Sequence, residues 1–341
     1  MTTHGGSEYI TLGSGVRRYA GMVRTRERIK LQLRAWVNRS ATHGWITFLN
    51  SDPFLAHMAT QYPRLISKIY RPYVTCTLTI GERVCALVDH YGFVRRMGWA
   101  ALVSGAARAP VVLAGFEGKA GAGYVIALKT GETMEREGEL VFQLSRGDVP
   151  IASCAFSFFP RGGNQLAIGG MQGTHAPDNL EQIRIVTREL YGIRPKHLLL
   201  KLVTALGHAL GCRNALLVSN DNHAVRRARR EGKVFADYDR FWRECGATRR
   251  PDGDFEMPCL PLMPPDLPNL SSNKRSEARR RYQLLTTVHA RTARALLIEY
   301  APAHLSTRLH CSAIQAMTGP HPLPASRHSG IPPAYTLPPN L

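Results

Sequence analysis

The chain has few cysteines, and they are not arranged as metal ligands or disulfide partners. Seven are scattered through 341 residues, no Cys-x-x-Cys pair occurs, and the number is odd. This pattern argues against a disulfide scaffold and against a structural zinc site, so no metal is expected. Most of the thiols are expected to be small buried side chains.

Membrane-spanning and export segments are also missing. No apolar run reaches the roughly 18 residues of a bilayer span, because the longest candidate, 98–115, contains Arg108 and Pro110. The first thirty residues lack the basic-then-apolar order of a signal peptide. These absences predict a cytoplasmic protein.

Acidic residues are scarce. The 25 Asp and Glu residues face 44 Lys and Arg residues, which gives a formal net charge of +19, and only eight of the basic residues are lysine. A field of this sign favours polyanionic partners such as nucleic acid, anionic lipid or phosphate-bearing cofactors. An arginine-rich surface that is simply solvated is an equal alternative.

Common catalytic motifs are absent as well. The sequence contains no HExxH, no P-loop, no GxGxxG and no Ser-His-Asp spacing. The enzyme classes that these motifs define are therefore not indicated. Any site must be built from residues that the fold brings together.

The N-terminal third is mainly helical. Residues 1–15 are rich in Gly, Ser and Thr and are expected to fray, and 16–105 form a helical region. Its first part, 17–37, interleaves arginines with apolar residues, which suits an anionic membrane, nucleic acid or an ordinary surface helix. Further helices are predicted at 53–58, between Pro63 and Pro72, and at 82–96, with a strand at 73–80.

Residues 106–262 predict an α/β (α+β) core. Strand candidates separated by glycine-containing turns indicate an antiparallel meander. Helices at 180–190 and 195–210, followed by a buried strand at 215–219, predict a crossover to a parallel strand. A helix at 238–245 and a strand at 254–257 follow. The meander strands are 110–116, 124–129, 139–144, 151–159 and 165–171.

The C-terminal part divides into two. Residues 263–300 are predicted to form a linker and a helix. The Pro-rich tail, 301–341, is expected to be disordered.

Polar residues follow both strands of the predicted crossover. Gln172 and Gly173 come just past the end of the first strand, with His175 behind them, and Asn220 and His223 follow the second strand. Ligands gather at such strand ends, and either histidine could serve as a general base. The alternatives are a tight turn, a helix cap and incidental loop histidines.

Two further sites are candidates. Arg194 and Lys196 stand at the start of the 195–210 helix, where free N–H groups favour an anion. Asp237 could supply an acid beside Tyr238. The alternative for Arg194 and Lys196 is a pair of solvated charges beside the helix-opening Pro195.

Several segments resemble the VirK/YbjX family of bacterial proteins. They occur in order between about residues 20 and 295: 71–73 (Arg-Pro-Tyr), 82–91, 168–173 (Ile-Gly-Gly-Met-Gln-Gly), 191–196, 218–223 and 236–242. The resemblance implies a bacterial protein in the cytoplasm or at the inner membrane. It also implies links to virulence, surface-protein display and resistance to cationic antimicrobial peptides. No settled biochemical activity comes with it.

The core is also loosely similar to the acetyltransferase fold, in which a splayed strand precedes a helix whose N-terminus takes the pyrophosphate of acyl-coenzyme A. The extra helix at 180–190 and the missing paired glycines at 194–196 depart from that pattern. Coenzyme A binding therefore stays open.

Two hypotheses follow. The first is an acyl- or aminoacyl-transferase acting on the cell envelope. The second is a non-enzymatic factor whose basic surface meets anionic lipid or an envelope partner. Nucleic-acid binding is weaker, because aromatics are not interleaved with arginine clusters such as 226–230. Donor, acceptor and oligomeric state are not specified by the sequence.

Overall fold

The computed structural model describes residues 9–131, 134–159, 165–173, 179–226, 231 and 236–299. His175, the arginine-rich segment 227–230 and the tail 301–341 lie outside the described residues. The expectation that fraying reaches residue 15 is wrong for residues 9–15. Ile10 is buried, and its backbone exchanges two hydrogen bonds of 2.8 Å with the Asn50 side chain.

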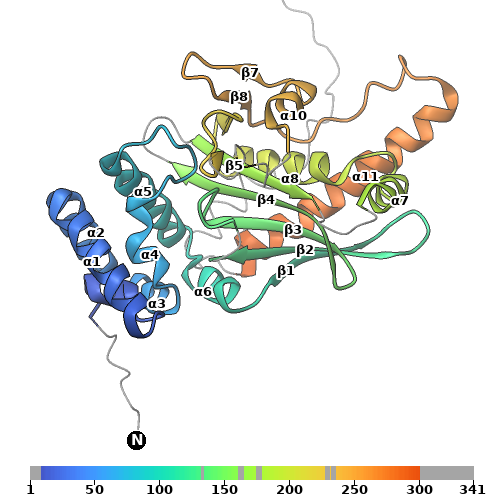
Figure 1. The fold of residues 1–341 in the computed structure, drawn as a ribbon. Helices are drawn as coiled ribbons and strands as arrows, with labels where there is room; N and C mark the ends of the chain where they lie inside the picture. Colours follow the sequence, from blue (N-terminus) through green and yellow to red (C-terminus); the bar gives the residue numbers. More distant parts are fainter. Residues whose placement is uncertain are drawn as a thin grey trace, which may run out of the picture.

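The N-terminal region is helical, as predicted, and gathers at the left of the molecule in Figure 1. Local signals set the helix starts: Asp52 caps α3 with Pro53 in its first position, and Thr79 and Glu82 form a capping box on α5. The elements are η1 (Leu12–Val16), α1 (Gly21–Val37), α2 (Arg39–Asn50), α3 (Pro53–Gln61), α4 (Arg64–Ser67), η2 (Lys68–Tyr70), α5 (Ile80–Arg96) and α6 (Ala100–Arg108).

The predicted strand at 73–80 is wrong. Tyr73 and Thr75 make isolated bridges, and Thr75 bridges to His223 rather than joining the sheet. Val74 between them has a φ of +57°, a conformation that β-branched residues rarely adopt. The β-branched residues that suggested a strand instead hold this segment against the loop after β6.

The central sheet contains eight strands within the described residues, in the order β1-β2-β3-β4-β5-β6-β8-β7. The first five form the predicted antiparallel meander, and β4 is central and buried over most of its length. The meander strands are β1 (Val111–Glu117), β2 (Gly123–Thr130), β3 (Leu140–Arg146), β4 (Val149–Phe159) and β5 (Gln165–Gly173).

The crossover also has the predicted form. After β5 come α7 (Asn179–Glu189), α8 (Pro195–Ala209) and β6 (Asn214–Leu217), and β6 pairs parallel with β5. Their pairing covers only 165–168 against 214–217, so β5 continues beyond its partner. The splayed exit agrees with the acetyltransferase-like order of elements predicted above, and α7 is the additional helix that departs from it.

The C-terminal elements complete the sheet and cover it. α10 (Tyr238–Glu244), β7 (Thr248–Arg249) and β8 (Phe255–Pro258) follow β6, and α11 (Ser272–Arg294) continues into η3 (Ala295–Glu299). α8 and α11 lie behind the sheet in Figure 1. One cluster of buried side chains runs from Ile10 to Leu297. None of the described helices is both long enough and apolar enough to cross a bilayer.

Candidate functional site

Three alternating glutamates precede β3 and contact three different parts of the molecule. Glu135 pairs with Arg64 at 3.2 Å and with Arg71 at 3.5 Å. Glu139 pairs with Lys68 and accepts a 2.6 Å hydrogen bond from Tyr91. The carboxyl between them, Glu137, turns toward β5. The segment 134–139 thus joins the N-terminal helices to the crossover strands.

Glu137 meets two residues that the sequence pointed to. Its Oε1 lies 3.3 Å from Nε2 of His223, and its Oε2 accepts a 3.4 Å hydrogen bond from Gln172. The Glu137 and His223 side chains are 5% and 1% exposed. The structure therefore brings Gln172 and His223 together through a carboxyl that was not predicted.

Two glycines of β5 make room for Glu137. Gly169 is the extra residue of a β-bulge, since Ala155 pairs with Gly170 and Phe156 with Ile168. A Cβ on Gly169 would overlap the Glu137 carbonyl oxygen, and a Cβ on Gly170 would lie 2.7 Å from its Oε1. The Gly-Gly pair is thus required by the close approach of the Glu137 backbone to Gly169 and of its carboxyl to Gly170.

His223 is held in a defined orientation. Its ring stacks on Tyr238 with 4.7 Å between centroids, and Nδ1 accepts a 3.3 Å hydrogen bond from the Val225 backbone. With Nδ1 accepting, the neutral ring carries its proton on Nε2, which faces Glu137. The Tyr238 hydroxyl accepts from Met171 N–H at 3.3 Å and donates to Met171 C=O at 3.1 Å. Tyr238 therefore satisfies the backbone N–H and C=O of Met171, in the part of β5 that does not pair with β6.

Burial changes the acidity of Glu137. Desolvation raises its pKa to about 8, although the charge of Arg136 and the Gln172 hydrogen bond oppose the rise. A carboxyl with such a pKa can both take up and return a proton near neutral pH. Together with His223, Glu137 forms a buried carboxyl–imidazole pair.

Asn220 and Asp237 come together but do not reach this pair. The Asn220 amide donates to Asp237 at 2.9 Å, and its oxygen accepts from the Tyr238 backbone at 2.9 Å. Asp237 also caps α10 through the Arg240 N–H. Through these contacts Asn220 and Asp237 hold Tyr238 in place, and the Tyr238 ring in turn stacks on His223. Asn220 and Asp237 are therefore positioning residues.

Arg194 and Lys196 are separated. Arg194 occupies the N-cap position of α8, is exposed and pairs with Glu244 at 3.4 Å. It lines a hollow of about 550 Å³ between α8 and α11 that also contains Lys201 and Arg281. Lys196 instead lies beside Gly173, whose added Cβ would be 3.7 Å from the lysine Cε, and burial lowers the Lys196 pKa.

A second buried cluster lies around Glu139. Burial alone would raise the pKa of Glu139, but Lys68, His90 and the hydrogen bonds from Lys68 and Tyr91 hold it below its ordinary value. His90 accepts a 3.2 Å hydrogen bond from the Phe158 backbone, and burial lowers the pKa of His90 to about 4. His90 is therefore a buried residue of the core.

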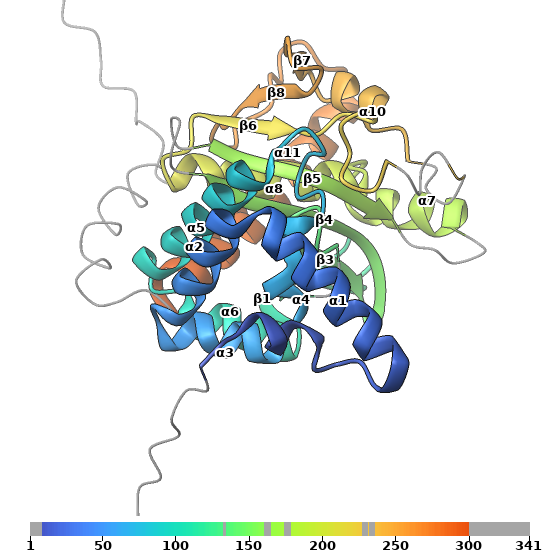
Figure 2. The ribbon, with the colours of Figure 1, turned by 60° about the vertical axis from the view of Figure 1, so that its left-hand side comes forward.

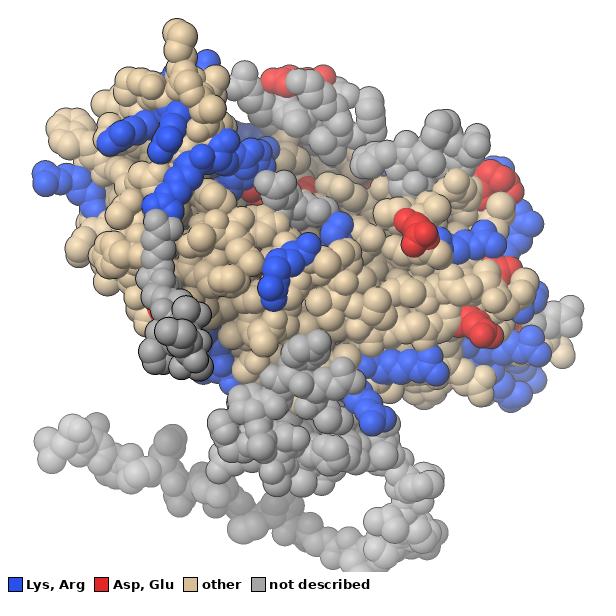
Figure 3. Space-filling model, turned by 90° about the horizontal axis from the view of Figure 1, so that it is seen from below, with Lys and Arg blue, Asp and Glu red and all other residues tan. Residues whose placement is uncertain are grey.

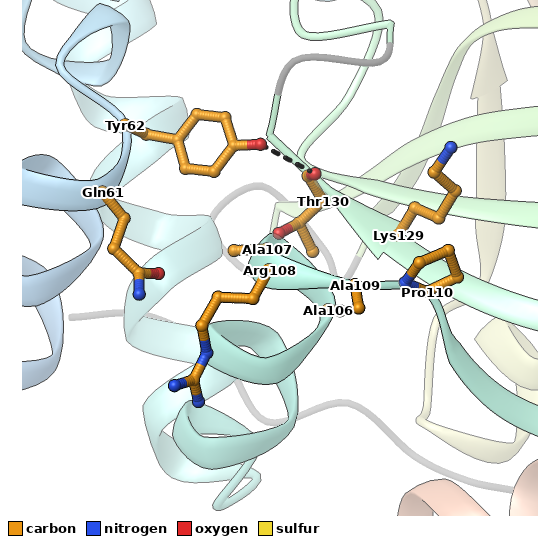
Figure 4. Close-up of a pocket in the computed structure, with 9 residues that line it drawn as sticks. All are labelled: Gln61, Tyr62, Ala106, Ala107, Arg108, Ala109, Pro110, Lys129 and Thr130. Carbon is orange, nitrogen blue, oxygen red and sulfur yellow. Dashed lines mark hydrogen bonds between the residues drawn. The ribbon is translucent and has the colours of Figure 1, made fainter.

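A separate hollow of about 410 Å³ opens between α3, α6 and β2. Figure 4 shows Arg108 and Lys129 on its walls, pointing away from one another, and Tyr62 donating a 3.4 Å hydrogen bond to Thr130 C=O. The two cations do not converge on one point. This hollow contains none of the predicted site residues.

The glutamates were missed because 131–139 was treated as a turn and the start of a strand. A period of two in Glu135, Glu137 and Glu139 was visible, in a chain that is poor in acid. That alternation could have indicated that the segment has a functional role. It could not have shown that Glu137 turns toward β5.

The fold and these contacts define a mixed α/β protein with a buried carboxyl–imidazole pair beside a βαβ crossover. The chain belongs to the family described as "Protein of unknown function (DUF535)", whose model matches residues 21–294. It is 29% identical over 273 residues to "Uncharacterized protein YbjX" of Escherichia coli (strain K12), covering 78% of this chain and 82% of the relative. The resemblance to the VirK/YbjX family is thereby confirmed.

Other similarities are more distant. An uncharacterized protein of Haemophilus influenzae is 27% identical over 122 residues, which is 36% of this chain and 41% of the relative. Two structures titled as a cAMP-binding acyltransferase from Mycobacterium smegmatis, one of them a mutant form, each align with a TM-score of 0.26. They are 12% identical for the mutant and 11% for the other, and the chain spans 61% and 65% of their lengths, with 63% and 67% of this chain covered. A likeness of this size does not establish a shared activity.

Proposed function

We propose that this protein is a transferase-like enzyme that moves an acyl or aminoacyl group onto an acceptor of the bacterial envelope. The observation that supports the proposal is the buried Glu137–His223 pair, which contacts Gln172 at the end of β5. Gln172 and the adjacent Gly173 are partly exposed. An acceptor bound at this strand end would lie beside Gln172, which contacts Glu137 directly.

The pair would handle the proton of the reaction. A hydroxyl or amine of the acceptor attacks the donor carbonyl carbon, and its proton passes to the ionised Glu137 carboxylate, which the Nε2–H of His223 faces. The bond between the carbonyl and the donor's leaving group then breaks, and the proton moves to that leaving group, a thiol for a thioester or a hydroxyl for an ester. Such general acid–base catalysis contributes about 10²- to 10⁴-fold.

Lys196 and the first turn of α8 would bind the anionic part of the donor. No other described residue forms a hydrogen bond or ion pair with Lys196, and its stem lies against Gly173. Acyl-coenzyme A is a candidate donor whose phosphates fit this position. Acyl-coenzyme A would not form hydrogen bonds with the Met171 backbone at the edge of β5, because the Tyr238 hydroxyl already binds both the N–H and the C=O of Met171.

Donor binding is testable by thermal shift. A ligand that binds only the folded state raises the melting temperature in proportion to its affinity. Acetyl-coenzyme A and longer acyl-coenzyme A species should stabilise the wild type and Arg194→Ala, which removes an outward-facing cation. They should not stabilise Lys196→Ala. A shift in all three proteins would remove Lys196 from the donor site, and no shift in any would remove this donor class.

The alternative is a non-enzymatic factor that binds an envelope component through its basic surface. Lys and Arg side chains gather at the end formed by the N-terminal helices, at the left of Figure 3. This alternative predicts that Glu137→Gln has no effect on function in cells while neutralisation of that surface abolishes it. The transferase proposal predicts loss of function in Glu137→Gln with donor binding retained.

A further inference from the structure

Helix α1 carries an apolar stripe that faces solvent. Met22, Ile29, Leu33 and Trp36 are spaced by seven, four and three residues, which places them on one face of a helix. Met22, Leu33 and Trp36 are 90%, 60% and 71% exposed, and Ile29 is exposed as well. An exposed row of large apolar side chains on a soluble domain marks an interaction surface.

The opposite face fixes α1 to the protein. Its buried residues are Leu31 and Ala35, and Leu31 packs beside Gly15 of η1. Figure 2 shows α1 on the outside of the helical layer, with one end extending past the body. The stripe is therefore presented without any rearrangement of the fold.

Basic residues run beside the stripe. Arg26, Lys30 and Arg34 follow one another at intervals of four, so they form a row along one edge of it, and all three are exposed. The acidic side chain of this helix, Glu27, pairs with Arg26 at 3.4 Å and with Lys30 at 3.0 Å. The blue side chains at the left of Figure 3 belong to this end of the molecule.

We propose that α1 docks on the surface of an anionic lipid bilayer. The stripe lies at the boundary between headgroups and acyl chains, and Arg26, Lys30 and Arg34 contact lipid phosphates. An apolar face flanked by Arg and Lys is the pattern of interfacial helices, and tryptophan prefers the headgroup level. At 17 residues with six charged side chains, α1 lies on the bilayer rather than across it.

The charge and the exposed apolar side chains of α1 together favour an anionic bilayer over a second copy of the chain or a nucleic acid. A second copy seated on the stripe would place one row of cations beside another, in a chain whose net charge is +19. Nucleic acid would satisfy the cations but leave the four apolar side chains without a partner. An anionic bilayer satisfies both, with about 1 kcal/mol from each basic residue near the surface.

Tryptophan fluorescence gives a local readout. Trp36 is exposed, whereas Trp45, Trp99 and Trp242 are fully buried. Vesicles of phosphatidylcholine with about one third phosphatidylglycerol should shift the emission to the blue and protect it from iodide. Vesicles of phosphatidylcholine alone should do neither. The response should be absent in Trp36→Phe.

Cosedimentation of the full chain with the same vesicles tests the surface itself. Leu33→Gln with Trp36→Gln should weaken binding by about tenfold or more, and Arg26→Gln, Lys30→Gln or Arg34→Gln by about fivefold each. The matched control, Leu180→Gln with Leu260→Gln, removes two exposed apolar side chains elsewhere and should bind as wild type.

Three outcomes would overturn the proposal. They are equal binding by the stripe variant and its control, a concentration-dependent dimer abolished by the stripe variant without lipid binding, and copurification with nucleic acid without lipid binding. The docking surface does not depend on the proposed function. Glu137→Gln should bind vesicles as the wild type does, so failure of one proposal leaves the other standing.

Discussion

Glu137 and Glu139 are two residues apart, both buried, and used in opposite ways. Glu139 has the lysine Lys68 and the hydroxyl of Tyr91, which keep it charged. Glu137 has an amide, a histidine and a more distant arginine, and burial raises its pKa to about 8. The comparison teaches that a nearby cation makes a buried carboxylate a structural tie. Without one, the carboxyl is ready to exchange a proton.

Removing Lys68, the cation that pairs with Glu139, should have the largest effect on stability. Lys68→Met leaves Glu139 without its charged partner inside the protein, and breaking a buried pair in this way costs about 3–5 kcal/mol. Urea denaturation at neutral pH would measure the loss of unfolding free energy. Lys68→Met with Glu139→Gln should recover a large part of it, because no unpaired charge then remains.

The control for this effect is Arg64→Met. It breaks a more exposed ion pair with Glu135, and such pairs contribute about 0–1 kcal/mol. If Arg64→Met and Lys68→Met lose equal stability, the distinction between the two kinds of glutamate contact is wrong.

The architecture was largely predictable because it rests on local patterns. Strand alternation between 110 and 171 and the helices predicted at 53–58, 82–96, 195–210 and 238–245 agree with the fold. The 73–80 segment was wrongly predicted to be a strand because its β-branched residues alternate. Thr75 instead contacts the 220–223 loop and does not join the sheet. That contact joins residues about 150 positions apart, which no local pattern records.

The site was predictable only in part. Gln172 and His223 were predicted because strand ends gather ligands, and the fold brings both of them to one carboxyl. Glu137 was not found, since its orientation depends on the bulge at Gly169 and on how 134–138 passes β5. Arg194 and Lys196 were grouped because they are two positions apart in sequence, although the helix turns them to different surfaces.

Gly169 offers the second test, since it determines whether Glu137 can lie against β5. Gly169→Ala would place a methyl group on the Glu137 carbonyl, which must move. We expect a loss of about 2–3 kcal/mol, because overpacking against backbone is not easily relieved. Gly115→Ala on β1 meets nothing within 4 Å and should be nearly neutral. Equal stability of the two variants would show that 134–138 does not approach β5 as described.

Per pH unit, the dependence of stability on pH is the smallest of these effects, and it separates the two glutamates by sign. The pKa of Glu137 is raised from 4.5 to about 8 on folding, so its contribution is complete below pH 4.5 and is lost as pH rises toward 8. Glu137→Gln should therefore gain stability relative to wild type by about 1 kcal/mol per pH unit inside this window.

The pKa of Glu139 moves the other way on folding, so its contribution is present above 4.5 and is lost as pH falls below that value. Glu139→Gln should show a deficit that is constant from pH 5 to 8 and shrinks in acid. Urea titrations of both variants at half-unit steps give the two profiles. If Glu137→Gln also shows a constant deficit, Glu137 is charged throughout this range and has no proton to return near neutral pH. The acid–base role of the pair would then fail, while its packing against β5 would stand.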